Sequence, residues 1–277
     1  MKKKIFALAM AMTMMLALAA CGPKDAPAAS GSGSGSAADG SNPAAVQTIV
    51  DGKLTVSTNA SFPPYEMVAG NGDLIGIDME VAAKIAEKLG LEVQIDDMGY
   101  DACLQAAQTG KSDMVMAGVS ITPERQEKMD FSDTYANAVQ VVIVKEDSPI
   151  KTPDDLANAE MIGAQVGTTG YIYCSDTPEN GGYGEDHVTA YKDGAIAIQA
   201  LMSGKIDAVV IDNLPAQEYV KANPGLKILD TEFANENYAI GFAKGNTQLV
   251  EAVNTALAEL TADGTVQQII DKYIPAK

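Results

Sequence analysis

Basic residues other than lysine are nearly missing from this sequence. Its 277 residues include one arginine, Arg125, and one histidine, His187. Acidic residues outnumber lysine and arginine by 37 to 19, which gives a formal net charge of −18. A negative field of this size repels the phosphates of nucleic acids and of anionic membrane surfaces, so neither class of partner is expected.

Cysteine and histidine are too few for a metal centre built from these residues. The three cysteines, Cys21, Cys103 and Cys174, include no CxxC pair, and His187 stands in an acidic, glycine-rich stretch. Structural metal sites need several such ligands at regular spacing. We therefore predict no metal and no cofactor, and a solvated loop around His187. Cys103 and Cys174 are expected to stay separate thiols, because the two-lobed fold described below places them in different lobes.

Long apolar runs are also missing, apart from one at the N-terminus. Three lysines precede an apolar run of about 16 residues, Ile5–Ala20, which is shorter than the roughly 20 residues that span a bilayer. These flanks are typical of a signal peptide over residues 1–20. The small residues that precede Cys21, and Gly22 that follows it, resemble a bacterial lipobox. This resemblance implies cleavage before Cys21 and a lipid on its sulfur. A secretory signal without lipid is the alternative. We expect an extracytoplasmic protein anchored to the outer face of the cell membrane.

Glycine, serine, alanine and proline dominate the next segment, residues 21–46. This composition offers almost nothing to bury and is typical of a flexible linker. The patterns that follow alternate between strand and helix. Segment 53–58 alternates in polarity, whereas segment 76–89 places apolar residues at helical spacing before Gly90. The alternation predicts an α/β fold with a mainly parallel sheet.

Further elements are expected along the chain from the same patterns. The expected strands span residues 53–58, 91–95, 113–117, 139–144, 161–165, 206–211 and 238–242. The expected helices span residues 76–89, 100–109, 152–157, 194–203, 249–260 and 265–273, and others begin after Gly170 and Asp212.

Short motifs along the chain resemble those of one protein family. The segment Gly76–Val81, followed by Ile85, Ala86 and Leu89, resembles the signature of the bacterial extracellular solute-binding proteins of family 3, which serve amino-acid ABC importers. The resemblance continues through further segments in the expected order: Asn59–Glu66, Gly118–Arg125, Phe131–Asp133, Gly167–Gly170, Gly204–Ala208 with Asp212, and Ala262–Thr265. It covers nearly all of residues 50–274.

The resemblance implies a two-lobed clam shell of the periplasmic-binding-protein type II, in which closure of the lobes buries a ligand. It places the first lobe at 47–135 plus 238–277, the second at 139–234, and hinges at 135–139 and 234–238. It also implies a monomer that delivers a free L-amino acid to the transmembrane subunits of an ABC permease.

Arg125 is a candidate for binding the ligand carboxylate. Thr122 and Pro123 begin a helix as N-cap and first residue, and a helix N-terminus attracts anions. A guanidinium can bind a carboxylate through two parallel hydrogen bonds, which a lysine cannot reproduce. The family resemblance implies the same role. The alternative is a surface ion pair with Glu124 or Asp130.

The ligand ammonium needs acceptors, and the resemblance implies the Gly118 carbonyl, the Ser120 hydroxyl and the Asp212 carboxylate. Asp212 follows an apolar strand, and open α/β sheets bind ligands at the carboxyl ends of their strands. A helix N-cap is the alternative for Asp212. The resemblance also implies that Thr169 and the loop at Gly167 contact the ligand carboxylate.

Selectivity for the ligand side chain is assigned to four residues by the same resemblance: Asn59, Phe62, Tyr100 and Gln165. Phe62 and Tyr100 could equally belong to the core. Relatives that bind cationic amino acids often have an aspartate at the position of Asn59, so a neutral polar amino acid such as glutamine is favoured, followed by arginine or lysine. Glu66 lies close enough in the sequence to bind a cationic side chain, and the alternative is that it only supports the loop. A second basic residue at a pocket position is missing, which disfavours acidic ligands.

Catalytic patterns are missing as well. The sequence has no Ser–His or Cys–His pair and no phosphate-binding loop, so we predict a binding protein rather than an enzyme. Two alternatives are a binding module that serves a membrane sensor without transport, and an exported enzyme that resembles cyclohexadienyl dehydratases.

Overall fold

The structure is a computed structural model, and it describes residues 46–274. These residues belong to one compact unit. The predicted signal peptide, Cys21 and the linker up to residue 45 lie outside the described residues. None of the described helices is long and apolar enough to cross a membrane.

The first lobe is built on a parallel sheet. Strand β1 (Lys53–Thr58) lies between β5 (Glu92–Asp97) and β6 (Met114–Val115), and both neighbours run parallel to it. Helix α1 (Ile77–Leu89) ends at Gly90, whose φ of 69° provides the predicted left-handed C-cap. The other elements of this lobe are β2 (Ser61–Phe62), β3 (Glu66–Val68), β4 (Leu74–Ile75), α2 (Tyr100–Gln108), α3 (Pro123–Lys128), α7 (Thr247–Ala262) and α8 (Thr265–Tyr273).

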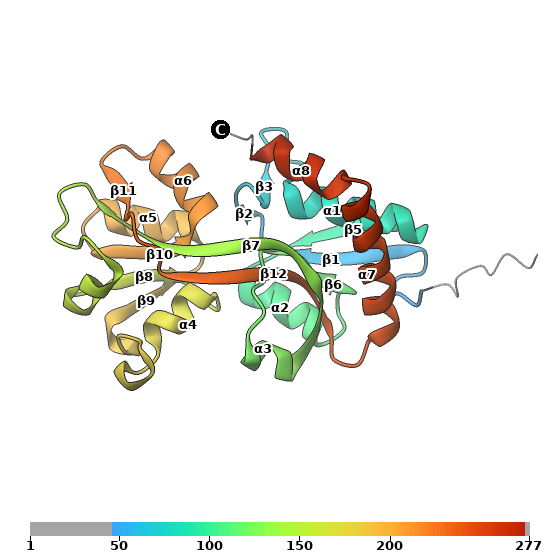
Figure 1. The fold of residues 1–277 in the computed structure, drawn as a ribbon, viewed down its shortest axis with the longest axis horizontal. Helices are drawn as coiled ribbons and strands as arrows, with labels where there is room; N and C mark the ends of the chain where they lie inside the picture. The colour runs from blue at the N-terminus through green and yellow to red at the C-terminus, as the bar shows by residue number, and fades with distance from the viewer. Residues whose placement is uncertain (1–45, 275–277) are drawn as a thin grey trace, which may run out of the picture. The chain divides into compact units, whose positions relative to one another are not determined.

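Two long strands run from the first lobe to the second (Figure 1). They are β7 (Met129–Lys145) and β12 (Ala234–Ala243), which pair in antiparallel register. The pairing joins residues 136–140 of β7 to residues 234–238 of β12, so the two predicted hinge segments lie side by side. The first half of β7 was not predicted from the sequence, because residues such as Asp130 and Asn137 interrupt the apolar pattern of a buried strand.

The second lobe repeats the parallel arrangement. Strand β8 (Ile162–Gln165) lies between β9 (Val188–Tyr191) and β10 (Ala208–Asp212), both parallel to it. The expected helix at 152–157 is a 3₁₀ helix over Pro153–Asn158. The other elements are α4 (Thr169–Ser175), α5 (Gly194–Met202), α6 (Asn213–Ala222), β11 (Leu226–Ile228) and short 3₁₀ turns at Pro178–Asn180 and Glu185–His187. The last of these turns leaves His187 exposed, as expected.

One continuous sheet passes through both lobes in the order β5-β1-β6-β12-β7-β10-β8-β9, with β11 beside β7. Its antiparallel pairs all involve β7 or β12, and the remaining pairs are parallel. The predicted α/β fold with two lobes and two crossing segments is therefore confirmed.

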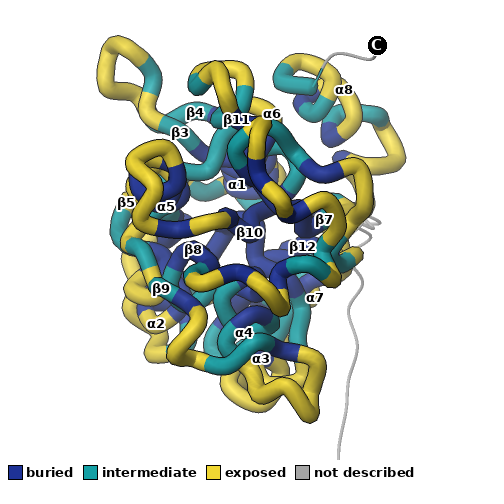
Figure 2. The backbone as a smooth tube through the Cα atoms, turned by 90° about the vertical axis from the view of Figure 1, so that its left-hand side faces the viewer, coloured by how far each residue is buried: buried dark blue, intermediate teal, exposed yellow. Residues whose placement is uncertain are grey.

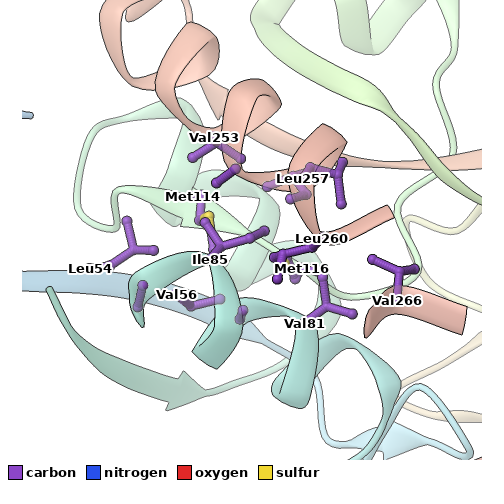
Figure 3. Close-up of a cluster of buried hydrophobic side chains, with 14 of the residues drawn as sticks. Leu54, Val56, Val81, Ile85, Met114, Met116, Val253, Leu257, Leu260 and Val266 are labelled. Atoms are coloured by element: carbon purple, nitrogen blue, oxygen red, sulfur yellow. The ribbon is translucent and has the colours of Figure 1, made fainter. Parts of the chain in front are cut away.

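Each lobe has its own hydrophobic core. In the first lobe, Val81 and Ile85 of α1 pack with Val253 and Leu257 of α7 over the sheet (Figure 3). In the second lobe, two clusters cover the two faces of β10. Burial is concentrated in the strands, while exposed residues lie mostly on the loops and outer helix faces (Figure 2).

The two remaining cysteines are separate, as predicted. Cys103 lies in a small cluster of the first lobe and Cys174 in a core cluster of the second. Both are buried free thiols.

Candidate ligand-binding site between the lobes

A small cavity of about 20 Å³ lies between the lobes, enough for about one water molecule. Ten residues line it: Asn59, Phe62, Glu66, Tyr100, Ala117, Gly118, Gln165, Thr168, Thr169 and Asp212. Eight of the eleven residues proposed from the sequence are among them. The other three, Ser120, Arg125 and Gly167, do not line it, and Arg125 donates to the carbonyls of the other two, as described below.

The lobes touch each other through hydrogen bonds. Gln165 Nε2 donates to Asn59 Oδ1 over 2.8 Å, and Tyr219 Oη donates to the Ser61 carbonyl over 3.1 Å. These bonds join the second lobe to the first, so the structure shows the lobes in contact.

Arg125 is buried, although it is charged. The Thr122 hydroxyl accepts a hydrogen bond from the Arg125 amide over 3.2 Å, which is the predicted N-cap. The guanidinium donates to three neutral oxygens, namely the Ser120 carbonyl at 2.7 Å, Tyr100 Oη at 3.2 Å and the Gly167 carbonyl at 3.0 Å. Within residues 46–274 no carboxylate pairs with Arg125. A guanidinium that is 6% exposed and lacks a counter-ion is strongly suited to bind an anion.

The alternative role for Arg125, a surface ion pair, is wrong. Lys128 pairs with Glu124 over 2.6 Å, and Lys244 pairs with Asp130 over 2.9 Å. Both acidic partners are therefore bonded to lysines.

Asp212 ends β10 and faces the cavity. It occupies the N-cap position of α6, but its side chain makes no capping hydrogen bond, so the alternative role as a cap is wrong. Its carboxylate instead accepts hydrogen bonds from Gln140 Nε2 at 2.7 Å and from the Tyr238 hydroxyl. Burial raises the pKa of Asp212 to about 7, and the nearby Glu236 adds to the rise, while the two hydrogen bonds oppose it.

Glu236 is a further residue of the site, which was not predicted from the sequence. Its Oε2 accepts hydrogen bonds from Ser120 Oγ at 2.7 Å, from Thr169 Oγ1 at 2.9 Å and from Gln140 Nε2 at 3.3 Å. It therefore links a hydroxyl of each lobe to the pair of connecting strands. Ser120 also forms a β-bridge with Tyr238, which brings it next to this carboxylate.

The sequence offers no signal for Glu236 or Gln140. Both lie in the crossing strands and reach the site only because β7 and β12 pair, and their partners lie far away along the chain.

Glu66 is fully buried at the cavity wall. In the part of the chain that the structure describes, neither of its oxygens has a hydrogen-bond donor as a partner. Burial raises the pKa of Glu66 well above its ordinary value, and the neighbouring Asp78 raises it further.

Two aromatic residues both line the cavity and pack in the protein. Phe62 stacks on Tyr65 with ring centres 5.8 Å apart and contacts the cores of both lobes. The Tyr100 ring lies 5.8 Å from the Arg125 guanidinium carbon and is otherwise in a core cluster. Phe62 and Tyr100 therefore both pack against core residues and line the cavity.

Gly118 must remain a glycine. Its φ is +56°, and a Cβ there would lie 2.9 Å from Phe62 Cε1. Its amide donates to Asp78 Oδ2 over 3.0 Å, which fixes the loop that leads to Ser120.

Comparison with known proteins decides the family. A sequence model of the bacterial extracellular solute-binding proteins, family 3, matches residues 54–276. The chain belongs to this family. It is similar to ABC transporter arginine-binding protein 1 of Escherichia coli strain K12, with 31% identity over 228 residues, covering 80% of this chain and 91% of that protein.

Solved structures agree with the family assignment. An ancestral arginine-binding protein bound to glutamine is 40% identical, with a TM-score of 0.75, over 82% of this chain and 100% of that one. ArtJ from Geobacillus stearothermophilus, an arginine-, lysine- and histidine-binding protein, is 33% identical, with a TM-score of 0.75. The match covers 81% of this chain and 96% of that one. This family 3 chain is therefore an extracytoplasmic solute-binding protein and not an enzyme.

Proposed function

We propose that this chain binds one L-amino acid between its lobes and delivers it to an ABC permease. The observation that carries the proposal is the buried Arg125 guanidinium, whose hydrogen-bond partners among residues 46–274 are neutral oxygens. Arg125 belongs to the first lobe and Asp212 to the second. An amino acid supplies a carboxylate to Arg125 and an ammonium to Asp212, so the closed form gains charged hydrogen bonds that the open form lacks.

Further contacts with the backbone of the ligand come from both lobes. We assign the Gly118 carbonyl and the Ser120 hydroxyl to the ammonium, and Thr169 with the loop at Gly167 to the carboxylate. The support is their position, because Gly118 and Thr169 line the cavity, Ser120 bonds to Arg125 through its carbonyl, and Gly167 does the same.

For the ligand side chain, we propose a group rich in hydrogen-bond donors. Asn59 and Gln165 hydrogen-bond to each other across the cavity. The carboxyl group of Glu66 accepts no hydrogen bond from the residues that the structure describes. Four buried carboxyls, on Glu66, Asp78, Asp212 and Glu236, surround a site whose one buried basic residue among those described is Arg125.

This charge balance changes the order of the candidate ligands. A basic amino acid such as arginine becomes the first candidate, and glutamine, which the position of Asn59 favours, becomes the second. The names of the similar proteins support both, since one is called arginine-binding and holds glutamine in its structure.

The lipid anchor on Cys21 and the monomeric state are also parts of this proposal. The lipobox-like sequence before Cys21 supports the anchor. A Cys21→Ser variant should no longer incorporate labelled fatty acid and should appear in the medium or periplasm, whereas the unchanged chain should stay with the membrane.

The test is a thermal-shift screen of residues 22–277 against the twenty amino acids, after unfolding and refolding to remove any bound ligand. A ligand at about 1,000 times its Kd adds roughly 4 kcal/mol, which shifts the Tm of a domain of this size by about 8–16 °C. We expect arginine or glutamine to give such a shift. If all twenty amino acids leave the Tm unchanged, the proposal is wrong.

A further inference from the structure

Glu66 lies at the cavity wall with a second carboxyl directly behind it. Asp78, at the start of α1, is also fully buried. The oxygens of Asp78 accept hydrogen bonds from the Gly118 amide at 3.0 Å and from the Tyr135 hydroxyl at 2.8 and 2.9 Å. Asp78 is thus well supplied with donors, whereas Glu66 has none.

The two residues are brought together by the backbone, because the Asp78 amide donates to the Tyr65 carbonyl over 3.0 Å, next to Glu66. Two ionised carboxylates repel each other, and a fully buried one that accepts no hydrogen bond and pairs with no cation is strongly destabilised. One of the two carboxyls must therefore carry a proton. Since Asp78 already accepts from two groups, the consistent arrangement has Glu66 protonated and donating to the Asp78 carboxylate. The second Glu66 oxygen then remains an acceptor for the cavity.

Among the residues that the structure describes, the surroundings of the pair provide no compensating cation. The ionisable groups that face it from neighbouring elements are acidic or neutral, namely Asp97, Asp212, Tyr65, Tyr100, Tyr135 and Cys103. Arg125 bonds to Tyr100 and to two carbonyls rather than to either carboxyl. Burial raises the pKa of Asp78 to about 6 despite its hydrogen bonds, and raises that of Glu66 further.

We propose that a basic amino acid displaces the proton shared by Glu66 and Asp78 when it binds. The ligand cation takes the place of the proton at the Glu66 carboxylate, and one proton leaves to the buffer for each ligand bound. A neutral amide such as that of glutamine hydrogen-bonds to the free Glu66 oxygen and leaves the proton in place. This inference rests on the proposed function and adds that basic ligands bind with proton release.

Calorimetry measures the proton directly. Binding of L-arginine and of L-glutamine to residues 22–277 is measured at pH 7 in buffers with different ionisation enthalpies, and the slope gives the protons released. Both ligands present the same ammonium to Asp212, so protons from that group cancel in the difference. We expect arginine to release about one proton more than glutamine. Equal proton release by the two ligands would overturn the inference while leaving the proposed function intact.

The variant Glu66→Gln keeps the protonated arrangement without a titratable group, because its amide can donate to Asp78 and its carbonyl can face the cavity. It should fold normally, bind arginine at least tenfold more weakly than the unchanged chain and lose the extra proton release. Glu127→Gln, at an exposed position of α3, is the matched control and should behave as the unchanged chain.

A measurement without any ligand separates this inference from the proposed function. Infrared spectra at pH 7 should show the carbonyl stretch of a buried protonated carboxyl, and the Glu66→Gln variant should lack this band. Identical spectra of the two proteins contradict the shared proton, even if no amino acid binds. If arginine fails to bind while glutamine binds, the exchange of a cation for the proton is wrong.

Discussion

The Arg125 guanidinium donates to the Gly167 carbonyl over 3.0 Å and so joins α3 of the first lobe to the loop before α4 of the second. The three observed bonds of Arg125 use three of its five N–H groups. The residue proposed to bind the ligand carboxylate thus also holds the lobes together. Binding and closure depend on the same side chain.

Replacement of this side chain tests its proposed role. Arg125→Lys keeps the charge but cannot reach the Ser120 and Gly167 carbonyls and a ligand carboxylate together, because an ammonium lacks the forked geometry. We expect calorimetry to show at least tenfold weaker amino-acid binding, with an unchanged circular dichroism spectrum. Unchanged affinity would exclude Arg125 as the carboxylate-binding residue.

Gly167 leaves room for the opposite lobe, and this can be tested by adding one methyl group. A Cβ at Gly167 would lie 1.7 Å from Asp101 Oδ1, on α2 of the first lobe. The Asp101 side chain is exposed and must rotate away for the lobes to close, so Gly167→Ala should weaken binding by up to about tenfold, which is about 1.4 kcal/mol. Affinity is measured by calorimetry, and closure by small-angle scattering with ligand present.

Gly181→Ala is the matched control for this variant. Gly181 also has a positive φ, at +91°, but a Cβ there has no atom within 4 Å. Both alanines should cost stability through backbone strain, on the order of 1 kcal/mol. Only Gly167→Ala should weaken ligand binding. Equal loss of affinity in the two variants would show that strain, not the contact with Asp101, is responsible.

Local sequence patterns predicted the helices and the parallel strands well, because their buried faces repeat at regular spacing. Helix α1 with its Gly90 cap and α3 with its Thr122 cap are examples. The polar half of β7 and the role of Glu236 could not be predicted in this way. Their positions follow from the pairing of two strands about a hundred residues apart, and a polar residue in a crossing strand has the same local pattern as one in a loop.

The role of Glu236 gives a prediction about stability. In Glu236→Ala, the hydroxyls of Ser120 and Thr169 lose a buried acceptor, which should lower the free energy of unfolding by about 1–3 kcal/mol. Glu236→Gln retains an oxygen at this position and should restore most of that loss. Denaturant unfolding of the two variants measures the difference. Equal stability of both variants and the unchanged chain would mean that these bonds contribute nothing.

The raised pKa of Asp212 predicts how the stability of the protein depends on pH. The pKa of Asp212 is about 7 in the folded protein and near 4 in the unfolded chain, so the folded state binds this proton more tightly. Its contribution to stability is therefore full below pH 4 and is lost as the pH rises through 7. Between pH 5 and pH 8 the free energy of unfolding of the unchanged chain should fall by on the order of 2 kcal/mol more than that of Asp212→Asn. The shared proton of Glu66 and Asp78 is present in both proteins and cancels in this difference.

The same variant separates stability from ligand recognition. Asp212→Asn should weaken the binding of an amino acid, because the ammonium loses a charged acceptor, but it should spare an analogue that lacks the ammonium. Denaturation at several pH values and calorimetry with both ligands measure the two effects. A pH dependence equal to that of the unchanged chain would contradict the raised pKa of Asp212. Equal loss of affinity for both ligands would mean that the ammonium does not bind here.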